Sequence, residues 1–173
     1  MRLIVGLLAL SCFAQIERVD SARQGVVYCH EMPGATVADK INACIGQAAG
    51  AGGKIADARG FTGASVSATS IDLCQQSSGS AHLKLLLGNV TLIYDGTGDA
   101  LIAETPGDAS KLCRFIEVQG SGRYTTTITV ASGKNAQSLV HLRYATHVAL
   151  KDLTLYAPGA GEGRLTQRFR TFW

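Results

Sequence analysis

Three polar residues in the last third of the chain have side chains suited to acid–base chemistry. His141, Arg143 and His147 fall in a predicted strand–turn–strand segment, and Lys151 and Asp152 follow it. An imidazole base, a cation and a carboxylate are the groups needed to abstract a proton or to bind a charged sugar. Strand surfaces also carry such residues for solubility alone. The sequence therefore names His141, Arg143 and His147 as candidates and leaves the catalytic residues unassigned.

Four carboxylates gather around glycine-containing turns: Asp95, Asp99, Glu104 and Asp108. Carboxylates bind calcium, and a pair of them can act as acid and base in glycoside hydrolysis. That reaction needs two carboxyl groups roughly 5–9 Å apart, and the sequence does not determine this separation. Asp is also common in turns, because its side chain hydrogen-bonds the nearby backbone. A structural role is therefore the favoured interpretation.

Asp57 and Arg59 stand two residues apart in a predicted strand, so their side chains point to the same side. The guanidinium could bind a carboxylated sugar, but an ion pair that supports the strand is the favoured interpretation. Cofactor motifs are absent from the sequence: the glycine turns at 96–98 and 120–122 lack the Gly-Lys-Ser/Thr continuation of a phosphate loop. The cysteine and histidine spacings fit no metal site either.

The composition is that of a folded domain with few charges. Of 173 residues, 46% are hydrophobic and 17% are charged, which excludes a disordered chain. Twenty glycines against three prolines indicate frequent turns without extended linkers. The formal net charge of +3 is too small to indicate nucleic acid, and no nucleic-acid-binding motif is present. We therefore expect one globular domain with no nucleic-acid partner.

The first 14 residues have the charge order of a secretory signal peptide. Met1 and Arg2 precede an apolar run over 3–14, and polar residues follow it. The run is shorter than the ~20 apolar residues that span a membrane. We therefore expect cleavage after Ala14 and a secreted or periplasmic protein without a membrane span. Lipid attachment at Cys12 is a minor alternative, because residues 9–12 weakly resemble a bacterial lipobox.

Cleavage at that point leaves four cysteines: Cys29, Cys44, Cys74 and Cys113. Four cysteines in an exported chain predict two disulfides, and three connectivities are open. We prefer the pairing of Cys29 with Cys44, because it would fasten the N-terminal segment to the helix predicted below. Four buried free thiols are the alternative.

A helix is predicted to begin at Thr36. Thr36 and Asp39 have the spacing of a capping box, with Asp in place of the usual Glu or Gln. Glycines at 50–53 are expected to end the helix and to start a turn. Apolar residues recur between these limits with a helical period and form one stripe: Val37, Ile41, Cys44, Ile45 and Ala48.

After residue 53, apolar residues alternate with polar ones, as in strands buried on one face. The alternation changes phase at Lys151 and Asp152, where we expect a bend. No second amphipathic helix is found among these strands, which argues against a doubly wound α/β sheet. An antiparallel β-sandwich and a solenoid of parallel coils both fit, and a loose repeat of strand and glycine turn favours the solenoid. The predicted inward residues include Leu83, Leu85, Leu87, Val90, Leu92, Tyr94, Ile116, Val118, Ile128, Val130, Val140, Leu142, Val148, Leu150, Leu153 and Leu155.

The segment 54–63, directly after the helix and its Ala-Gly-Gly ending, resembles the opening of bacterial proteins of the pectate-lyase superfamily. Residues 83–88 and 147–155 are similar to later coils of these proteins. The resemblance covers about residues 29–159 and implies an all-β fold, a right-handed parallel β-helix with an N-terminal capping α-helix. In that family the helix covers the open end of the β-helix, and the apolar stripe suits this task. An antiparallel β-sandwich is the alternative fold.

The resemblance also implies a class of function. Members of the superfamily cleave acidic polysaccharides by β-elimination or hydrolysis, or serve as non-catalytic surface proteins. Their catalytic residues come from central coils, which would follow most of this sequence. We therefore expect an exported relative of polysaccharide lyases and glycoside hydrolases without a complete active site, and a non-catalytic adhesin or glycan-binding module is the alternative. The implied partner is an acidic polysaccharide. Calcium is a possible cofactor by family resemblance only.

The predicted organisation has four parts. Residues 1–14 form the signal peptide, 15–34 an N-terminal segment, and 35–159 the capping helix and first coils. Residues 160–173 are expected to form an irregular basic tail, with arginines at 164, 168 and 170. The tail has no strand alternation, and neither a glycine turn nor a second cap is expected in it. A truncated or frame-shifted end is one interpretation of this tail.

Overall fold

The computed structural model describes residues 25–50, 55–74, 83–104, 113–143 and 145–158. The predicted signal peptide, Cys12, Asp108 and the basic tail lie outside these ranges. The elements, in chain order, are β1 (Val26–Tyr28), η1 (Cys29–Glu31), α2 (Val37–Gly50), β2 (Ile55–Ala58), β3 (Gly63–Ser67), β4 (Ile71–Asp72), β5 (Leu83–Leu87), β6 (Val90–Tyr94), β7 (Asp99–Glu104), β8 (Cys113–Gln119), β9 (Thr127–Val130), β10 (Ser138–Arg143), β11 (Ala145–Lys151) and β12 (Thr154–Tyr156).

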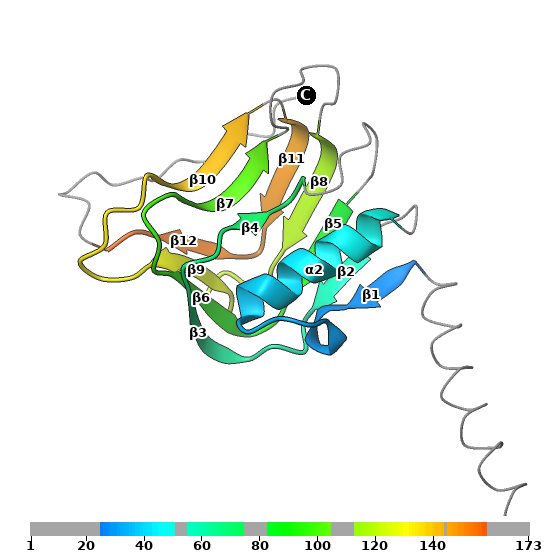
Figure 1. Ribbon diagram of the computed structural model, residues 1–173, viewed down its shortest axis with the longest axis horizontal. Coiled ribbons are helices and arrows are strands. Elements are labelled where there is room, and N and C mark those ends of the chain that lie inside the picture. Colours follow the sequence, from blue (N-terminus) through cyan, green and yellow to red (C-terminus); the bar gives the residue numbers. More distant parts are fainter. Residues whose placement is uncertain (1–24, 51–54, 75–82, 105–112, 144, 159–173) are drawn as a thin grey trace, which may run out of the picture.

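The strands form three sheets, and every strand pairing in the described ranges is parallel. Sheet A has the order β1-β2-β5-β8-β11, sheet B the order β3-β6-β9-β12, and sheet C the order β4-β7-β10. From β2 onward the chain passes from sheet A to sheet B to sheet C and returns to sheet A (Figure 1). The alternative of an antiparallel β-sandwich is therefore wrong, because successive strands join different sheets and pair in parallel.

The predicted apolar faces point inward and stack in rows across the sheets. In sheet A, Leu85 lies in register with Ala56 on one side and with Val118 on the other, and all three are fully buried. In sheet B, Leu92 is in register with Ile128, and both are buried. Parallel in-register pairing places like side chains next to each other on one face, so the alternation read from the sequence becomes a continuous core.

Helix α2 packs against β1 and β2 of sheet A and against β3 and β4, the first strands of sheets B and C. Its apolar stripe is buried there: Ile41, Ile45 and Ala48 are at most 1% exposed. Asn42, on the same helix, donates to the carbonyl of Ser70 (2.7 Å) and accepts from the N–H of Asp72 (3.0 Å). The Asn42 amide thus takes the place of a neighbouring strand at this edge of β4, and the helix covers both the side chains and the backbone of that edge.

The predicted capping box forms at the start of α2. The N–H of Asp39 donates to Thr36 Oγ1 (3.2 Å), and the N–H of Thr36 donates to Asp39 Oδ2 (3.0 Å). The Thr36 hydroxyl also donates to Asp39 Oδ2 (2.8 Å), and this bond is the main cause that lowers the pKa of Asp39. The shorter Asp therefore fulfils the role that Glu or Gln has in most capping boxes.

Two disulfides form among the described residues. Cys29 of η1 is bonded to Cys44 of α2, which is the preferred pairing from the sequence, and Cys74 is bonded to Cys113. The Cα–Cα distances are 5.0 and 5.8 Å, within the usual range for disulfides. The alternative of four free thiols is wrong. Two disulfides fit an extracellular or periplasmic location, where the surroundings are oxidising.

The turns between sheets A and B leave little room for side chains. At Gly88, between β5 and β6, an added Cβ would lie 2.5 Å from the carbonyl oxygen of Arg59 in the turn of the preceding circuit. At the corresponding turn between β11 and β12, Asp152 adopts a positive φ of 53°. This confirms the bend predicted at Lys151 and Asp152, and the bend brings Leu153 and Leu155 back against the core.

Candidate functional site

Two of the three candidate residues lie together on the outer face of sheet C. His141 and Arg143 belong to β10, which pairs with β7 so that His141 is opposite Ile102 and Arg143 is opposite Glu104. Because alternate residues of a strand share a face, this register places the imidazole and the guanidinium on the same face as Glu104, whereas Asp99 is in register with Ser138 at the start of β7. Figure 1 shows β4, β7 and β10 side by side.

The imidazole of His141 lies between two carboxylates. Its Nδ1 is 3.1 Å from Asp99 Oδ2, and its Nε2 is 3.5 Å from Glu104 Oε2. Ser138 donates to the other Asp99 oxygen, Oδ1 (2.6 Å), and Arg143 Nη1 lies 3.2 Å from Glu104 Oε1. We call these five residues, Ser138, Asp99, His141, Glu104 and Arg143, the sheet C cluster.

The sheet C cluster has the parts of a weak general base. An Nδ1–H that donates to Asp99 leaves the Nε2 lone pair available as an acceptor. His141 Nε2 is buried and has no hydrogen-bond partner in the described part of the chain. Arg143, however, balances the charge of Glu104, and the imidazole is 29% exposed. The geometry supports proton transfer at His141 only if a substrate lies against β7 and β10.

A further carboxylate on sheet C belongs to β4. Asp72 is in register with Ile102, so it lies on the same face as His141. Burial raises the pKa of Asp72, the nearby charge of Glu104 raises it further, and a hydrogen bond from the Cys74 N–H (2.8 Å) opposes both effects. The outer face of sheet C is therefore more acidic than basic.

His147, the third candidate, lies in sheet A and not with the other two. It is part of β11, where the ladder to β8 pairs residues 146 and 148 and passes over His147, just as β8 passes over Phe115. Both residues have φ of 56°, and their rings stack with centroids 4.6 Å apart. The sequence placed His147 in a strand–turn–strand segment and Phe115 in a strand, and the stacking of these two equivalent positions is a tertiary effect.

The outer face of sheet A carries a second polar group, which we call the sheet A charge row: Lys84 of β5, Glu117 of β8 and Lys151 of β11. Glu117 Oε1 lies 2.8 Å from Lys84 Nζ, and Glu117 Oε2 accepts from Lys151 Nζ at 2.5 Å. These two hydrogen bonds, Lys151 first, lower the pKa of Glu117. One carboxylate is thus shared by two ammonium groups, and the row has one positive charge in excess.

Asp57 and Arg59 form the expected ion pair at the end of β2. Arg59 Nη2 lies 2.6 Å from Asp57 Oδ2, and the N–H of Arg59 donates to Asp57 Oδ1 at 3.0 Å. Asp57 is 5% exposed, and its bonds to Arg59 lower its pKa. The favoured structural interpretation of this pair is confirmed.

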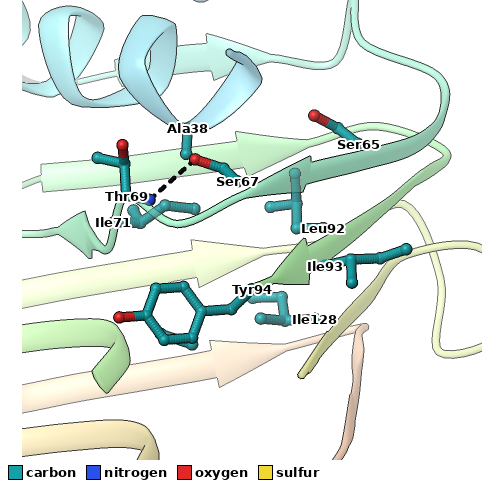
Figure 2. A pocket seen from close by; sticks show the side chains of 10 residues that line it. Ala38, Ser65, Ser67, Thr69, Ile71, Leu92, Ile93, Tyr94 and Ile128 are labelled. Carbon is teal, nitrogen blue, oxygen red and sulfur yellow. Dashed lines mark hydrogen bonds between the residues drawn. The ribbon is translucent and has the colours of Figure 1, made fainter. Parts of the chain in front are cut away.

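A small cavity lies between the start of α2 and the inner face of sheet B. It is lined by Ala38, by Ser65 and Ser67 of β3, and by apolar side chains that include Leu92 and Tyr94 (Figure 2). Its volume is about 20 Å³, which is enough for about one water molecule and too small for a sugar. This cavity therefore has no room for a sugar.

The described residues do not fit a bound metal. No group of three or more His, Cys, Asp or Glu side chains within these ranges is placed to hold a metal ion. Calcium takes six to eight oxygen ligands, whereas the oxygens of Asp99 and Glu104 face Ser138, His141 and Arg143. This part of the chain therefore contains no set of ligands that matches the calcium implied by the family resemblance.

Comparison with protein-family models, with curated proteins and with solved structures gives no significant match to this chain. In the part of the chain that the structure describes, no helix is long and apolar enough to cross a membrane. Over these described ranges the structure defines a mostly-β protein with three parallel sheets, two disulfides and one α-helix that packs against strands at one end of all three sheets.

Sequence reasoning missed the partners of its own candidates. It named Asp99 and Glu104 as turn carboxylates but did not join them to His141, and it did not single out Ser138, Phe115, Lys84 or Glu117 for any role. The only signal available was the alternation that puts His141 and Arg143 on one face of a strand. Which strand lies next to that face depends on the order of strands in the sheet, and this has no local pattern.

Proposed function

We propose that this chain is a right-handed parallel β-helix of the pectate-lyase-like kind, capped by α2, and that it binds an extended acidic polysaccharide on the outer face of sheet A. The fold is supported by the repeated passage of the chain through sheets A, B and C and by the contacts of α2 with the strands at one end of all three sheets, β1 and β2, β3, and β4. The right hand follows from the strong preference of parallel crossover connections.

The observation that carries the binding function is the sheet A charge row. Lys84 and Lys151 flank Glu117 on three adjacent strands, and both ammonium groups lie against the same carboxylate, 2.8 and 2.5 Å from its two oxygens. Their side chains are 39% and 52% exposed, so a polymer in solution can reach both. A polysaccharide with regularly placed carboxylates can contact both lysines at once. Glu117 then keeps part of its contact with each lysine.

An outer-face site also fits the rest of the structure. The cavity between α2 and sheet B is too small for a sugar, and the sheet C side carries the carboxylates Asp72, Asp99 and Glu104, which would repel an acidic chain. The stacked rings of Phe115 and His147 lie on sheet A, on the same strands as Glu117 and Lys151. We further propose, from the two disulfides and the signal-like leader, that the protein is exported.

Binding to polygalacturonate tests this proposal. We expect the mature full chain to bind the polymer, and the double variant Lys84→Met/Lys151→Met to bind at least tenfold more weakly, because it loses both cations and leaves Glu117 unpaired. The measurement is titration calorimetry at two salt concentrations. Lys134→Met is the matched control, since Lys134 pairs with Asp95 away from sheet A (3.0 Å). Equal affinity of wild type and double variant, or no binding to polygalacturonate at all, would refute the proposal.

Cleavage by the sheet C cluster is the second candidate function, and the observation that favours it is the buried Nε2 of His141, which lies 3.5 Å from Glu104 Oε2 but makes no hydrogen bond within the described ranges. In this alternative His141 removes the proton next to a uronate carboxyl group while Asp99 holds its ring, a C=C bond forms as the glycosidic C–O bond breaks, and the leaving oxygen takes a proton from solvent. The check is incubation with acidic and neutral polysaccharides while unsaturated products and new reducing ends are followed. Activity that disappears in His141→Gln would establish this function, and the absence of products would eliminate it for the chain studied.

A further inference from the structure

The turn between β5 and β6 carries a sequence motif that the proposed binding site does not use. Asn89, Val90 and Thr91 match the pattern Asn-X-Ser/Thr, in which X is any residue except Pro. In exported proteins this pattern is the acceptor of N-linked glycans and lies in surface turns. The sequence contains three asparagines, and the other two, Asn42 and Asn135, have no Ser or Thr two residues further on.

Asn89 lies at the tip of this turn and is exposed. The N–H of Val90 donates to the carbonyl of Gly88 (2.9 Å), and this bond closes a three-residue turn centred on Asn89. The backbone carbonyl of Asn89 accepts from the N–H of Gly63 in the preceding circuit (3.1 Å). Its side-chain amide makes no hydrogen bond to another residue in the described ranges. The backbone is therefore fixed, while the amide nitrogen is accessible from solvent.

Thr91, the hydroxyl residue of the motif, is also accessible. It lies on the outer face of β6, whereas Val90 before it is buried. Its register neighbours are Ala64 in β3 and Thr127 in β9, and Val90 is in register with Gly63. The Thr91 hydroxyl makes no hydrogen bond to another described residue. Small neighbours on these strands thus leave room for a bulky group at the turn.

The other two asparagines lack this combination of motif and access. The amide of Asn42 donates to the carbonyl of Ser70 and accepts from the N–H of Asp72, so it belongs to the packing of α2. Asn135 is exposed between β9 and β10, but Gln137 stands where the motif requires a hydroxyl. Asn89 alone combines the motif with an exposed side chain among these three.

We propose that Asn89 is an N-glycosylation site, a proposal that rests on the export proposed above. The co-substrate is an oligosaccharide carried on a lipid pyrophosphate of the secretory membrane. Nδ2 of Asn89 displaces the pyrophosphate from C1 of the first sugar. The N–C1 bond forms, the C1–O bond breaks, Nδ2 releases one proton, and the leaving oxygen keeps the electron pair. The glycan then covers the turn between sheets A and B from the solvent side.

The test uses the full chain with its own leader, expressed in cultured animal cells. Secreted protein is treated with peptide N-glycosidase, an amidase that removes N-linked glycans and leaves Asp where the modified Asn stood. Peptide mass spectrometry then locates the change. Thr91→Val removes the hydroxyl and keeps the shape of the side chain, whereas Thr91→Ser keeps the hydroxyl. Asn89→Gln removes the acceptor, and Asn135→Gln is the matched control at an exposed asparagine without the motif.

We expect the wild-type chain to carry a glycan that the amidase removes, with Asn89 read as Asp afterwards. Asn89→Gln and Thr91→Val should lose the glycan completely, because each lacks one of the two groups that the transfer requires. Thr91→Ser and Asn135→Gln should retain it.

A secreted wild-type chain without a glycan would overturn the proposal and leave export standing. The variant Asn89→Gln/Gln137→Thr, which completes the motif at Asn135, shows that the cells used can modify this chain. A glycan that persists in Asn89→Gln or Thr91→Val would overturn the proposal as well. A chain that stays inside the cells would refute export, and the glycosylation proposal would fall with it.

Discussion

Asp57 shows how one carboxylate organises a strand end. It accepts hydrogen bonds from the backbone N–H of Arg59 (3.0 Å) and from Arg59 Nε and Nη2 (3.0 and 2.6 Å). The carboxylate is almost fully buried, while the guanidinium is largely exposed. The pair therefore holds the turn after β2 in place, and it has no free charge to offer a ligand.

Replacement of Asp57 by Asn is expected to reduce the free energy of unfolding by about 1–3 kcal/mol, because charged hydrogen bonds to a buried group are lost. Urea denaturation at pH 7 measures this loss. Asp95→Asn is the control, because Asp95 pairs with Lys134 at the surface, where an ion pair contributes less than about 1 kcal/mol. Equal losses in the two variants would contradict the structural role given to Asp57.

The same variant has a predicted pH dependence. The pKa of Asp57 is lowered below its ordinary value of 3.8, mainly by the Arg59 side chain. Its contribution is therefore complete above the ordinary value and is lost as the pH falls through the lowered pKa of the folded protein. We expect the difference in unfolding free energy between wild type and Asp57→Asn to be constant at neutral pH and to shrink below about pH 4. A difference that grows in acid would be inconsistent with the lowered pKa.

At the scale of elements, α2 is defined by its first turn as much as by its apolar stripe. The capping box of Thr36 and Asp39 satisfies backbone N–H groups that the helix itself cannot pair. Thr36 Oγ1 also lies 3.2 Å from Ser67 Oγ at the end of β3. The cap thus fixes where the helix begins and where it meets sheet B.

We expect Thr36→Val to lower the free energy of unfolding by about 1 kcal/mol, the usual effect of losing an N-cap side chain. Far-ultraviolet circular dichroism during urea titration measures it. Thr91→Val, in the outer face of β6, removes a hydroxyl from a strand and should change stability by less than about 0.5 kcal/mol. If both variants lose the same amount, the cap does not contribute as the geometry indicates.

At the scale of the whole molecule, the disulfides connect parts of the chain that the sheets alone do not join. Cys29–Cys44 ties η1 to the capping helix across 15 residues, and Cys74–Cys113 closes a loop of 39 residues between sheet C and sheet A. Helix and strand layers are thus fastened to each other by covalent bonds as well as by packing.

Removal of each disulfide by paired substitution with Ala is expected to destabilise the protein, and more so for the longer loop, because the entropy of loop closure grows with the logarithm of loop length. The chain-entropy relation gives about 3 kcal/mol for Cys29→Ala/Cys44→Ala and about 4 kcal/mol for Cys74→Ala/Cys113→Ala. Urea denaturation of both variants measures which of the two loses more free energy of unfolding. A larger loss for the shorter loop would show that contacts of α2, and not loop closure, dominate.

Much of the local structure was predictable from the sequence. The helix and its cap followed from Thr36, Asp39 and a stripe of apolar residues, because both signals lie within one or two turns of chain. The inward faces of β5, β6, β8 and β9 followed from strict alternation. The bend at Asp152 was indicated by a change of phase in the alternation of apolar and polar residues. These features depend on neighbours close in sequence, and the structure confirms them.

Only the tertiary structure decided which strands pair and in which direction. Parallel and antiparallel sheets have the same alternation, so the sequence alone left the β-sandwich open. The contact of His141 with Asp99 and Glu104, the stack of Phe115 on His147, and the sharing of Glu117 by two lysines all join different circuits of the chain. The partners of outward polar residues have no local signal in the sequence, because burial and the alternation of apolar residues constrain only the inward face. The order of strands in each sheet is what brings these partners within reach.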